Sequence, residues 1–142
     1  MPQSVPQLAS SPPSGNSAAN NASGRGSIDD QTWRKFIPDA LESEEIVKTG
    51  RISKRKGFFS KNRQLILTDL PRLVYVDPTA MEYKGNIPWN VSQPVQVKKL
   101  SDKKFDVVAT MEGGEKRAYH LTAQDGADHW IEAIQHQLDV NK

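Results

Sequence analysis

The hydrophobic pattern of residues 46–122 constrains the fold more than any other feature of the chain. From Ile46 onward the spacing of apolar residues changes toward two, and short apolar runs alternate with turn residues. We expect seven strands near residues 45–53, 61–69, 72–77, 83–89, 94–99, 104–111 and 115–122, with turns at Gly57, Leu70-Pro71, Asp77-Pro78, Ser101-Asp102 and Gly113-Gly114. Seven strands at this spacing predict a mainly β domain, either a sandwich or a barrel.

After the last strand the spacing of apolar residues changes again, to that of a helix. It indicates a closing α-helix from about Gln124 to Asp139. One face of this helix carries Ala127, Trp130, Ile131, Ile134 and Leu138. Thr122, with Asp125 three residues later, resembles a capping box at its start. We expect the helix to cap the β structure, with Trp130 in the core.

A short helix is expected before the first strand. Ser27 or Asp29 can cap it, and Pro38 ends it. Its apolar stripe consists of Trp33, Phe36 and Ile37. A helix this short is not stable alone, so the stripe is expected to lie on the main body as an N-terminal extension of the domain.

Residues 1–26 differ in composition from the rest of the chain. They are mostly Ser, Pro, Asn, Gln, Ala and Gly, with Arg25 as the charged residue and no aromatic side chain. Such a segment cannot bury enough apolar surface to offset chain entropy. We therefore expect a disordered linker over residues 1–26 and one domain over 27–142, as a piece of a longer chain.

Two classes of protein are excluded by residue usage. The chain has no cysteine, which excludes a disulfide framework and thiolate zinc sites and fits a cytoplasmic location. No window approaches the roughly 20 apolar residues needed to span a bilayer. Any membrane contact is therefore expected to be peripheral.

Positive charge is concentrated in the first predicted hairpin. Seven Lys or Arg and no Asp or Glu occur between Lys48 and Arg63, in a chain with a net charge of +2. If the strands pair around Gly57, then Lys54, Lys61 and Arg63 converge on one side. Converging cations suit a ligand that carries several phosphates. The alternative is a solvated charged loop with no ligand.

Aromatic residues accompany these cations. Phe58 and Phe59 lie at the predicted loop tip beside Arg55 and Lys56, a combination that favours contact with lipid headgroups. The alternative is that one or both phenylalanines fold back onto the core.

Tyr75 and Lys84 belong to the site if their strands reach the same place, and would supply a hydroxyl and another cation. The alternative is a half-buried strand tyrosine and an ordinary surface lysine.

No catalytic or metal-binding constellation is evident in the sequence. A nucleophile with a base, a glycine-rich nucleotide loop and kinase motifs are all missing, so we expect no enzyme activity and no cofactor. His129, Glu132 and His136 share one side of the predicted final helix, but no fourth ligand accompanies them, and we expect no metal site.

The motifs together resemble a pleckstrin homology (PH) domain. The resemblance rests on Lys54, six residues later Lys61-x-Arg63, the seven strands and the closing helix with Trp130. Residues 54–59, 63–68, 75–78 and 84–89 are similar to the C-terminal PH domain of phosphoinositide-dependent protein kinases. The resemblance covers about residues 32–137.

The resemblance implies a function as well as a fold. It implies a regulatory module of a serine/threonine protein kinase that binds 3-phosphoinositides and is recruited to the plasma membrane, with possible intramolecular contact with a kinase domain. The implied headgroup ligands are Lys54, Lys61, Arg63, Tyr75, Lys84 and, as a weaker candidate, Arg117.

Several alternatives stay open at this point. Lys61 and Asn62 stand where relatives usually have two arginines, so the hairpin carries fewer cations, and trisphosphate, bisphosphate and soluble inositol phosphates are all candidate ligands. A protein-interaction domain on the same scaffold is the alternative function. Nucleic-acid binding is not expected, because the basic patch is small and no open stacking platform is indicated.

Overall fold

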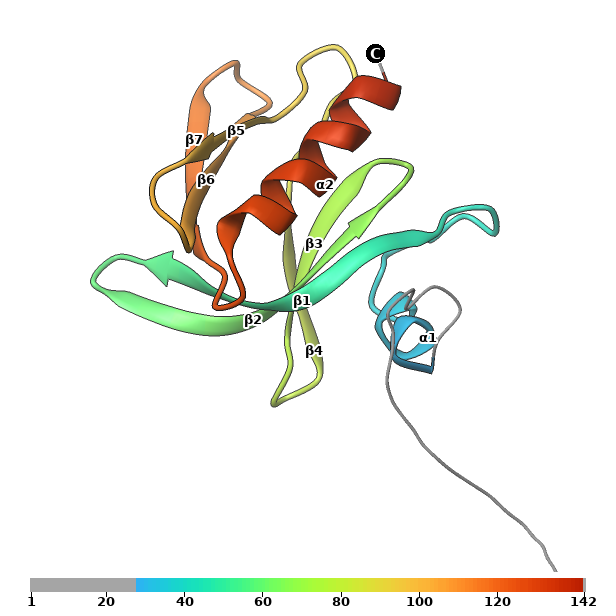
Figure 1. Cartoon of the computed structure of the whole chain (residues 1–142). Helices are drawn as coiled ribbons and strands as arrows, with labels where there is room; N and C mark the ends of the chain where they lie inside the picture. The colour runs from blue at the N-terminus through green and yellow to red at the C-terminus, as the bar shows by residue number, and fades with distance from the viewer. Residues whose placement is uncertain (1–27, 142) are drawn as a thin grey trace, which may run out of the picture. The chain divides into compact units, whose positions relative to one another are not determined.

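The structure, a computed structural model, describes residues 28–141 (Figure 1). The predicted linker over residues 1–26, the cap residue Ser27 and the side chain of Asp29 lie outside the described part. The elements are α1 (Ile28–Arg34), β1 (Ile46–Lys56), β2 (Phe59–Thr68), β3 (Arg72–Asp77), β4 (Glu82–Ile87), β5 (Gln96–Lys99), β6 (Lys104–Thr110), β7 (Lys116–Thr122) and α2 (Ala127–Val140). None of the helices in the described residues is long and apolar enough to cross a membrane.

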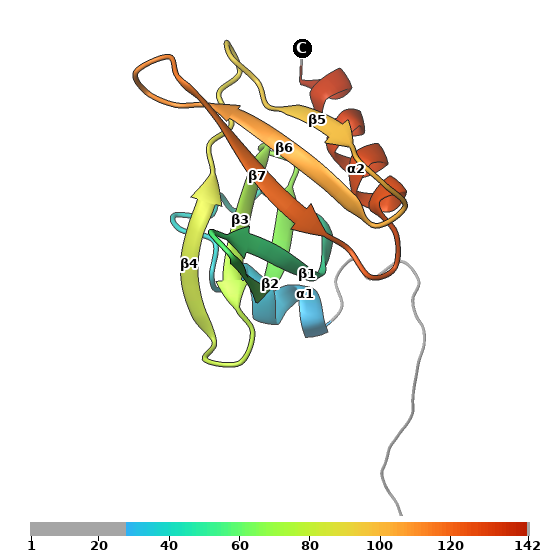
Figure 2. The ribbon, with the colours of Figure 1, turned by 90° about the vertical axis from the view of Figure 1, so that its left-hand side faces the viewer.

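The seven predicted strands and the closing helix are confirmed. The strands form one antiparallel sheet in the order β4-β3-β2-β1-β7-β6-β5. The sheet is strongly bent, so that β5, β6 and β7 lie as a second layer across β1–β4, with α2 beside β5 (Figure 2). This arrangement encloses a core between the two layers and the helix.

The core contains the residues that face inward from both layers. Trp130 of α2 is 1% exposed and lies in it, as expected. The larger buried side chains of this cluster are Ile52, Leu65, Leu67, Leu73, Ile87, Phe105, Tyr119, Leu121, Trp130 and Ile134. Their burial removes a large apolar area from water, which stabilises the bent sheet.

The sheet region of β2 and β3 is buried on both faces. Leu65 and Leu67 point into the main core, whereas Ile66 between them packs on the opposite face with Val74 and Val76. Trp33 and Phe36 cover that opposite face together with the buried Ile37. This burial explains why β2 ends in a continuous apolar run instead of an alternating one.

Several predicted boundaries differ from the structure. The first hairpin is longer than expected, because β1 and β2 stay paired up to Lys56 and Phe59 despite the charged side chains. The first helix ends at Arg34 instead of Pro38, since the next backbone hydrogen bonds, Phe36 to Trp33 and Ile37 to Arg34, are those of tight turns. These turns bring Ile37 into its buried position.

The predicted capping box at Thr122 and Asp125 is wrong. Thr122 is still part of β7, and α2 begins at Ala127 after Gly126, whose φ is 115°. No side chain caps the helix. Instead, the amide of Ala127 donates to the carbonyl of Asp102 at 2.7 Å, so a distant loop replaces the local cap.

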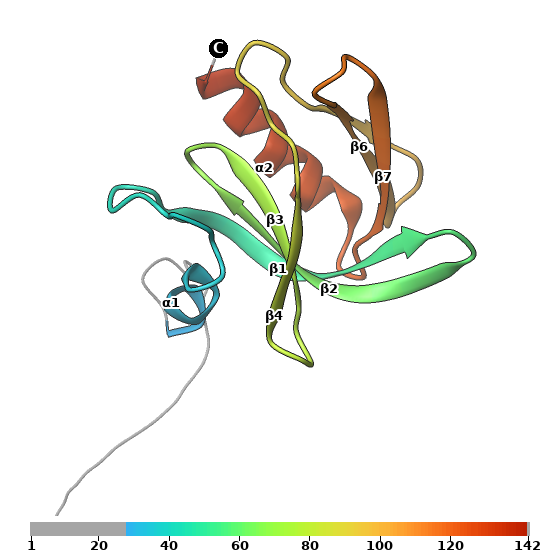
Figure 3. The same ribbon diagram turned by 180° about the vertical axis from the view of Figure 1, so that it is seen from behind.

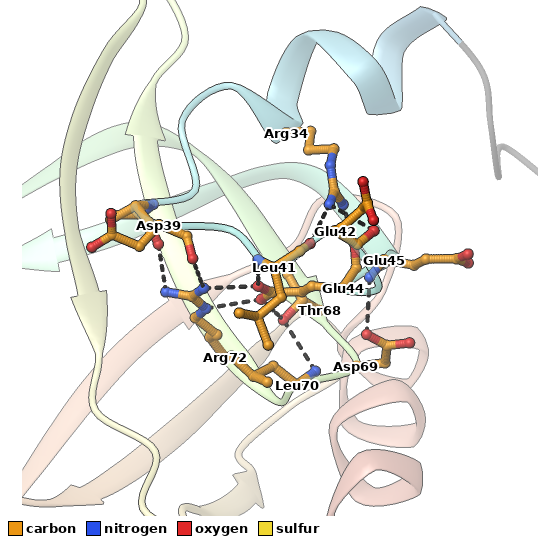
Figure 4. Close-up of polar contacts among 11 residues, drawn as sticks. Arg34, Asp39, Leu41, Glu42, Glu44, Glu45, Thr68, Asp69, Leu70 and Arg72 are labelled. Carbon is orange, nitrogen blue, oxygen red and sulfur yellow. Dashed lines mark hydrogen bonds and ion pairs between the residues drawn. The ribbon is translucent and has the colours of Figure 1, made fainter.

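A buried carboxylate joins the segment before β1 to the sheet (Figure 4). Glu44 is 2% exposed and accepts hydrogen bonds from Oγ1 of Thr68 at 2.6 Å and from Nε and Nη2 of Arg72 at 2.8 and 2.7 Å. Arg72 also donates to the carbonyl of Pro38 at 2.7 Å, and Arg34 donates to the carbonyls of Leu41 and Glu44. Residues far apart in sequence thus satisfy one buried charge.

The ionisation of Glu44 links this network to pH. Burial raises the pKa of Glu44, but the hydrogen bonds from Arg72 and Thr68 outweigh it and hold the pKa below the ordinary value of 4.5. A carboxyl group with a lowered folded-state pKa stabilises the fold above its ordinary pKa. That stability is lost as the pH falls through the lower, folded-state pKa.

We predict that Glu44→Gln lowers the free energy of unfolding at pH 7 by about 2 kcal/mol, because Arg72 loses its buried partner. The variant should also lose part of the acid sensitivity of the wild type below pH 4.5. Chemical denaturation at a series of pH values measures both effects. Glu42→Gln is the control, since Glu42 is exposed; equal stability of the two variants at pH 7 would contradict the prediction.

Candidate functional site

The register of the first hairpin brings the predicted cations together. Lys54 of β1 lies directly opposite Lys61 of β2, and Arg63 lies opposite Ile52. Ile52 is a core residue, so Lys54, Lys61 and Arg63 lie on the inward face of the hairpin, where the core ends. Gly57 makes the turn with a φ of 62°.

The hairpin forms one wall of an open hollow of about 610 Å³, which we call the basic hollow. Figure 3 shows the hairpin extending past the end of the β7 layer. The lining residues come from β1–β4 and β7 and the first turn: Lys54, Arg55, Lys56, Gly57, Lys61, Arg63, Tyr75, Lys84, Arg117, Ala118, Tyr119 and His120. Seven of these residues are Lys or Arg and none is Asp or Glu. All six residues predicted as ligands from the sequence therefore line one hollow.

Lys54 is a partly buried cation of the basic hollow. Its Nζ lies 4.9 Å from the ring centre of Tyr75 and 5.8 Å from that of Tyr119. Burial lowers the pKa of Lys54, and the charges of Arg63, Lys56 and Arg117 lower it further. No carboxylate among the described residues forms an ion pair with this ammonium group. An anion bound here would relieve the repulsion between these cations.

The aromatic wall depends on a glycine. Tyr75 of β3 lies opposite Gly85 of β4, and a Cβ at Gly85 would come within 2.7 Å of the Tyr75 hydroxyl oxygen. Gly85 therefore makes room for the ring beside Lys54. Burial raises the pKa of Tyr75, so its hydroxyl stays protonated and can donate a hydrogen bond.

Two acidic residues flank the hollow without lining it. Asp77 lies 3.8 Å from Nη1 of Arg63, and Glu82 lies 3.6 Å from Nζ of Lys84. The amides of Ala80 and Thr79 donate to Asp77 and lower its pKa, so it stays ionised as a counter-charge behind Arg63. These weak pairs orient the two cations and leave them available to a ligand.

The structure separates the two alternatives for the loop-tip aromatics. Phe58 is 96% exposed and Phe59 is 74% exposed, so neither folds back onto the core. Arg55 and Lys56 beside them are exposed, and Nε of Arg55 donates to the carbonyl of Gly57 at 3.0 Å. The tip thus presents apolar and cationic groups side by side.

The structure shows on which face of the hairpin the uncharged Asn62 lies. In the structure Asn62 lies opposite Ser53, on the other face from Lys61 and Arg63, and it does not line the basic hollow. Its lack of charge does not reduce the cations of the hollow.

From β7, the sequence predicted only Arg117 as a residue of the site and missed the others that line the hollow. Tyr119 and His120 line the hollow, and the guanidinium of Arg117 lies 5.8 Å from the ring centre of Tyr119. The alternation Arg117-x-Tyr119 was the available signal, because alternate strand residues share a face. The contact of β7 with the hairpin was not readable from sequence.

The histidines of α2 belong to a different surface. His129, Glu132 and His136 line a shallow hollow with Lys48 and Val47. Across residues 28–141 no group of three or more His, Cys, Asp or Glu side chains is placed to hold a metal ion.

Comparison with known proteins identifies relatives of the chain. It is 44% identical over 92 residues to a probable serine/threonine-protein kinase, pdkA, of Dictyostelium discoideum, covering 64% of this chain and 12% of that protein. It is 38% identical over 104 residues to human 3-phosphoinositide-dependent protein kinase 1, covering 72% of this chain and 17% of that protein. The chain thus spans less than a fifth of either kinase.

Solved structures show the same fold. The solution structure of the C-terminal PH domain of human pleckstrin matches with a TM-score of 0.54 and 20% identity, over 72% of this chain and 87% of that one. The complex of PDZ-RhoGEF DH/PH domains with GTP-gamma-S activated RhoA matches with a TM-score of 0.61 and 14% identity, over 77% of this chain and 33% of that one.

The family assignment rests on the sequence match and the fold together. Residues 31–142 match the PH domain family. This part of the chain contains no catalytic domain, although its relatives are kinases. With its seven-stranded antiparallel sheet and closing helix, the chain belongs to the PH domain family and is homologous to the PH domains of 3-phosphoinositide-dependent protein kinases.

Proposed function

We propose that this PH domain binds the headgroup of a 3-phosphoinositide in the basic hollow and thereby recruits its parent chain, a serine/threonine protein kinase, to the plasma membrane. The observation that carries the proposal is the charge of the hollow: seven Lys or Arg line it and no acid does. Clustered cations repel one another unless an anion neutralises them. A ligand with several phosphates supplies that charge.

The arrangement of donors supports a polyphosphate over a single carboxylate. Lys54, Lys61 and Arg63 line the hairpin wall, and Lys84 and Arg117 come from β4 and β7. Arginine offers a planar fork to a phosphate, and lysine offers a movable point charge. Tyr75 adds a protonated hydroxyl.

The hairpin tip supports a membrane-bound ligand over a free one. Phe58 and Phe59 are exposed next to Lys56, which lines the hollow. Aromatic side chains beside cations favour the interface between headgroups and acyl chains. The same tip would therefore insert into lipid while the hollow holds the headgroup.

The relatives support the choice of headgroup. Several of them, including the human protein, are 3-phosphoinositide-dependent protein kinases by name. The motif resemblance over residues 54–89 includes Lys54, Lys61, Arg63, Tyr75 and Lys84 of the hollow. Contact between this domain and a kinase domain elsewhere in the parent chain is part of the same proposal.

We predict that Lys54→Ala and Arg63→Ala each weaken binding to liposomes that contain a 3-phosphoinositide by about ten-fold or more, because each removes charge-assisted contacts. Sedimentation with liposomes, with the lipid composition varied, measures the effect. Lys103→Ala is the matched control, since Lys103 is exposed in the β5–β6 turn and does not line the hollow.

Thermal stability of the three variants should be nearly equal to that of the wild type. Wild-type binding by both hollow variants would favour a protein-interaction domain on this scaffold. Equal binding to a soluble inositol polyphosphate and to liposomes would favour a soluble ligand.

We predict that Phe58→Ser combined with Phe59→Ser weakens liposome binding by about ten-fold but leaves the affinity for a soluble inositol tetrakisphosphate unchanged, because only the membrane arm uses the aromatic tip. Val91→Ser is the control, since Val91 is also an exposed apolar residue, at 66%. A parallel loss of both affinities would show that the tip acts on the hollow itself.

We predict that Gly85→Ala weakens headgroup binding by about five-fold, because the added Cβ displaces the Tyr75 ring from Lys54. Gly114→Ala is the matched control, since Gly114 also has a positive φ, of 89°, and a Cβ there meets no atom within 4 Å. Calorimetric titration with a soluble inositol tetrakisphosphate measures both variants. Unchanged affinity of Gly85→Ala would exclude Tyr75 as part of the binding wall.

A further inference from the structure

A histidine–aspartate pair lies at the edge of the basic hollow. His120 of β7 and Asp106 of β6 are direct cross-strand partners, and Nδ1 of His120 lies 2.8 Å from Oδ1 of Asp106. The Asp106 side chain is 14% exposed, whereas the His120 side chain is 51% exposed. The aspartate thus holds one ring nitrogen and leaves the rest of the imidazole accessible.

The sheet places His120 at the hollow although it points away from the core. β1 and β7 are paired only at Ser53–Thr122 and Lys54–Leu121. Beyond Lys54 the hairpin departs from β7, so residues of both faces of β7 reach the gap. Ala118 and His120 line the hollow for this reason, together with Tyr119 from the inward face.

Charged groups on neighbouring strands surround the pair. On the side of the hollow, His120 shares the lining with Lys54, Arg55 and Lys56 of β1. On the other side, Asp106 lies opposite Lys98 of β5.

On their own strands the pair has Lys104 two residues before Asp106 and Arg117 three residues before His120. Asp106 is the acid that faces the imidazole, and the other charges around it are cations.

The chemistry of imidazole makes this position dependent on a proton. A neutral imidazole that donates Nδ1–H to Asp106 carries no hydrogen on Nε2. Its Nε2 is then only an acceptor and cannot donate a hydrogen bond to a phosphate oxygen. A protonated imidazole donates from both nitrogens, so it can keep Asp106 and donate to a phosphate at the same time. Nε2 of His120 has no hydrogen-bond partner among residues 28–141.

We propose that His120 is an additional ligand-binding residue of the basic hollow, which contacts the bound polyphosphate in its protonated form while Asp106 holds the ring. Because the protonated ring can hold Asp106 and donate to a phosphate at the same time, binding takes up a proton at His120, and affinity should be higher at pH 6 than at pH 8. This inference rests on the proposed polyphosphate function and adds a specificity-determining residue to it.

The experiment compares wild type and His120→Gln by calorimetric titration with soluble inositol tetrakisphosphate at pH 6.0, 7.0 and 8.0. The ligand's own phosphates also titrate in this range, so the readout is the ratio of wild-type to variant affinity at each pH. We expect a ratio of about one at pH 8.0 and about five-fold at pH 6.0, because one charge-assisted contact is gained.

Matched variants separate binding from structure. His136→Gln on α2 carries the same change away from the hollow and should behave as the wild type at every pH. Asp106→Asn removes the carboxylate that holds the ring at Nδ1, so the rise in affinity toward pH 6.0 should shrink. Repeating the titrations in two buffers of different ionisation enthalpy measures the proton uptake, which His120→Gln should reduce.

Two outcomes would overturn the role of His120. Only the second would also overturn the proposed polyphosphate function. A ratio that is constant from pH 6.0 to 8.0, with binding that still depends on Lys54, would remove His120 from the site and leave the proposed function intact. Absence of wild-type binding at every pH would overturn the polyphosphate function and the role of His120 with it.

Discussion

The brief pairing of β1 with β7 is the constraint on which the site depends. β1 is paired with β2 along its whole length, up to Lys56 and Phe59, but with β7 only at two positions. The two pairs join the layers of the bent sheet and close the core around Trp130. Past Lys54 nothing pairs β1 with β7, and the space between them becomes the basic hollow. A longer ladder would bring the strands together and leave no room for a ligand.

Burial on the outer face of the sheet also holds the strands of the hairpin in place. β2 and β3 are buried on both faces, with Trp33, Phe36 and Ile37 covering the face away from the core. The Glu44 carboxylate fixes the segment that carries these residues by its hydrogen bonds to Thr68 and Arg72. The cations at the end of the hairpin therefore extend from strands that are held along most of their length, which reduces the conformational entropy lost when a ligand binds.

Local patterns predicted much of the fold and of the site. Period-two alternation located the seven strands, and the i, i+2 relation placed Lys61 and Arg63 on one face opposite Lys54. Patterns failed where a distant partner replaced a local one. The start of α2 is an example, because the carbonyl of Asp102 satisfies the Ala127 amide and no capping side chain is needed.

The sequence by itself determined the elements, the family resemblance and the excess of positive charge in the first hairpin. These depend on side-chain periodicity and residue type, which are local properties. Only the tertiary structure decided that Tyr75, Lys84 and Arg117 reach the same hollow, that Gly85 makes room for the tyrosine ring, and that His120 joins the edge. These facts depend on where β4 and β7 lie relative to the hairpin. That placement follows from how the whole sheet bends to bury its core, and no short stretch of sequence encodes it.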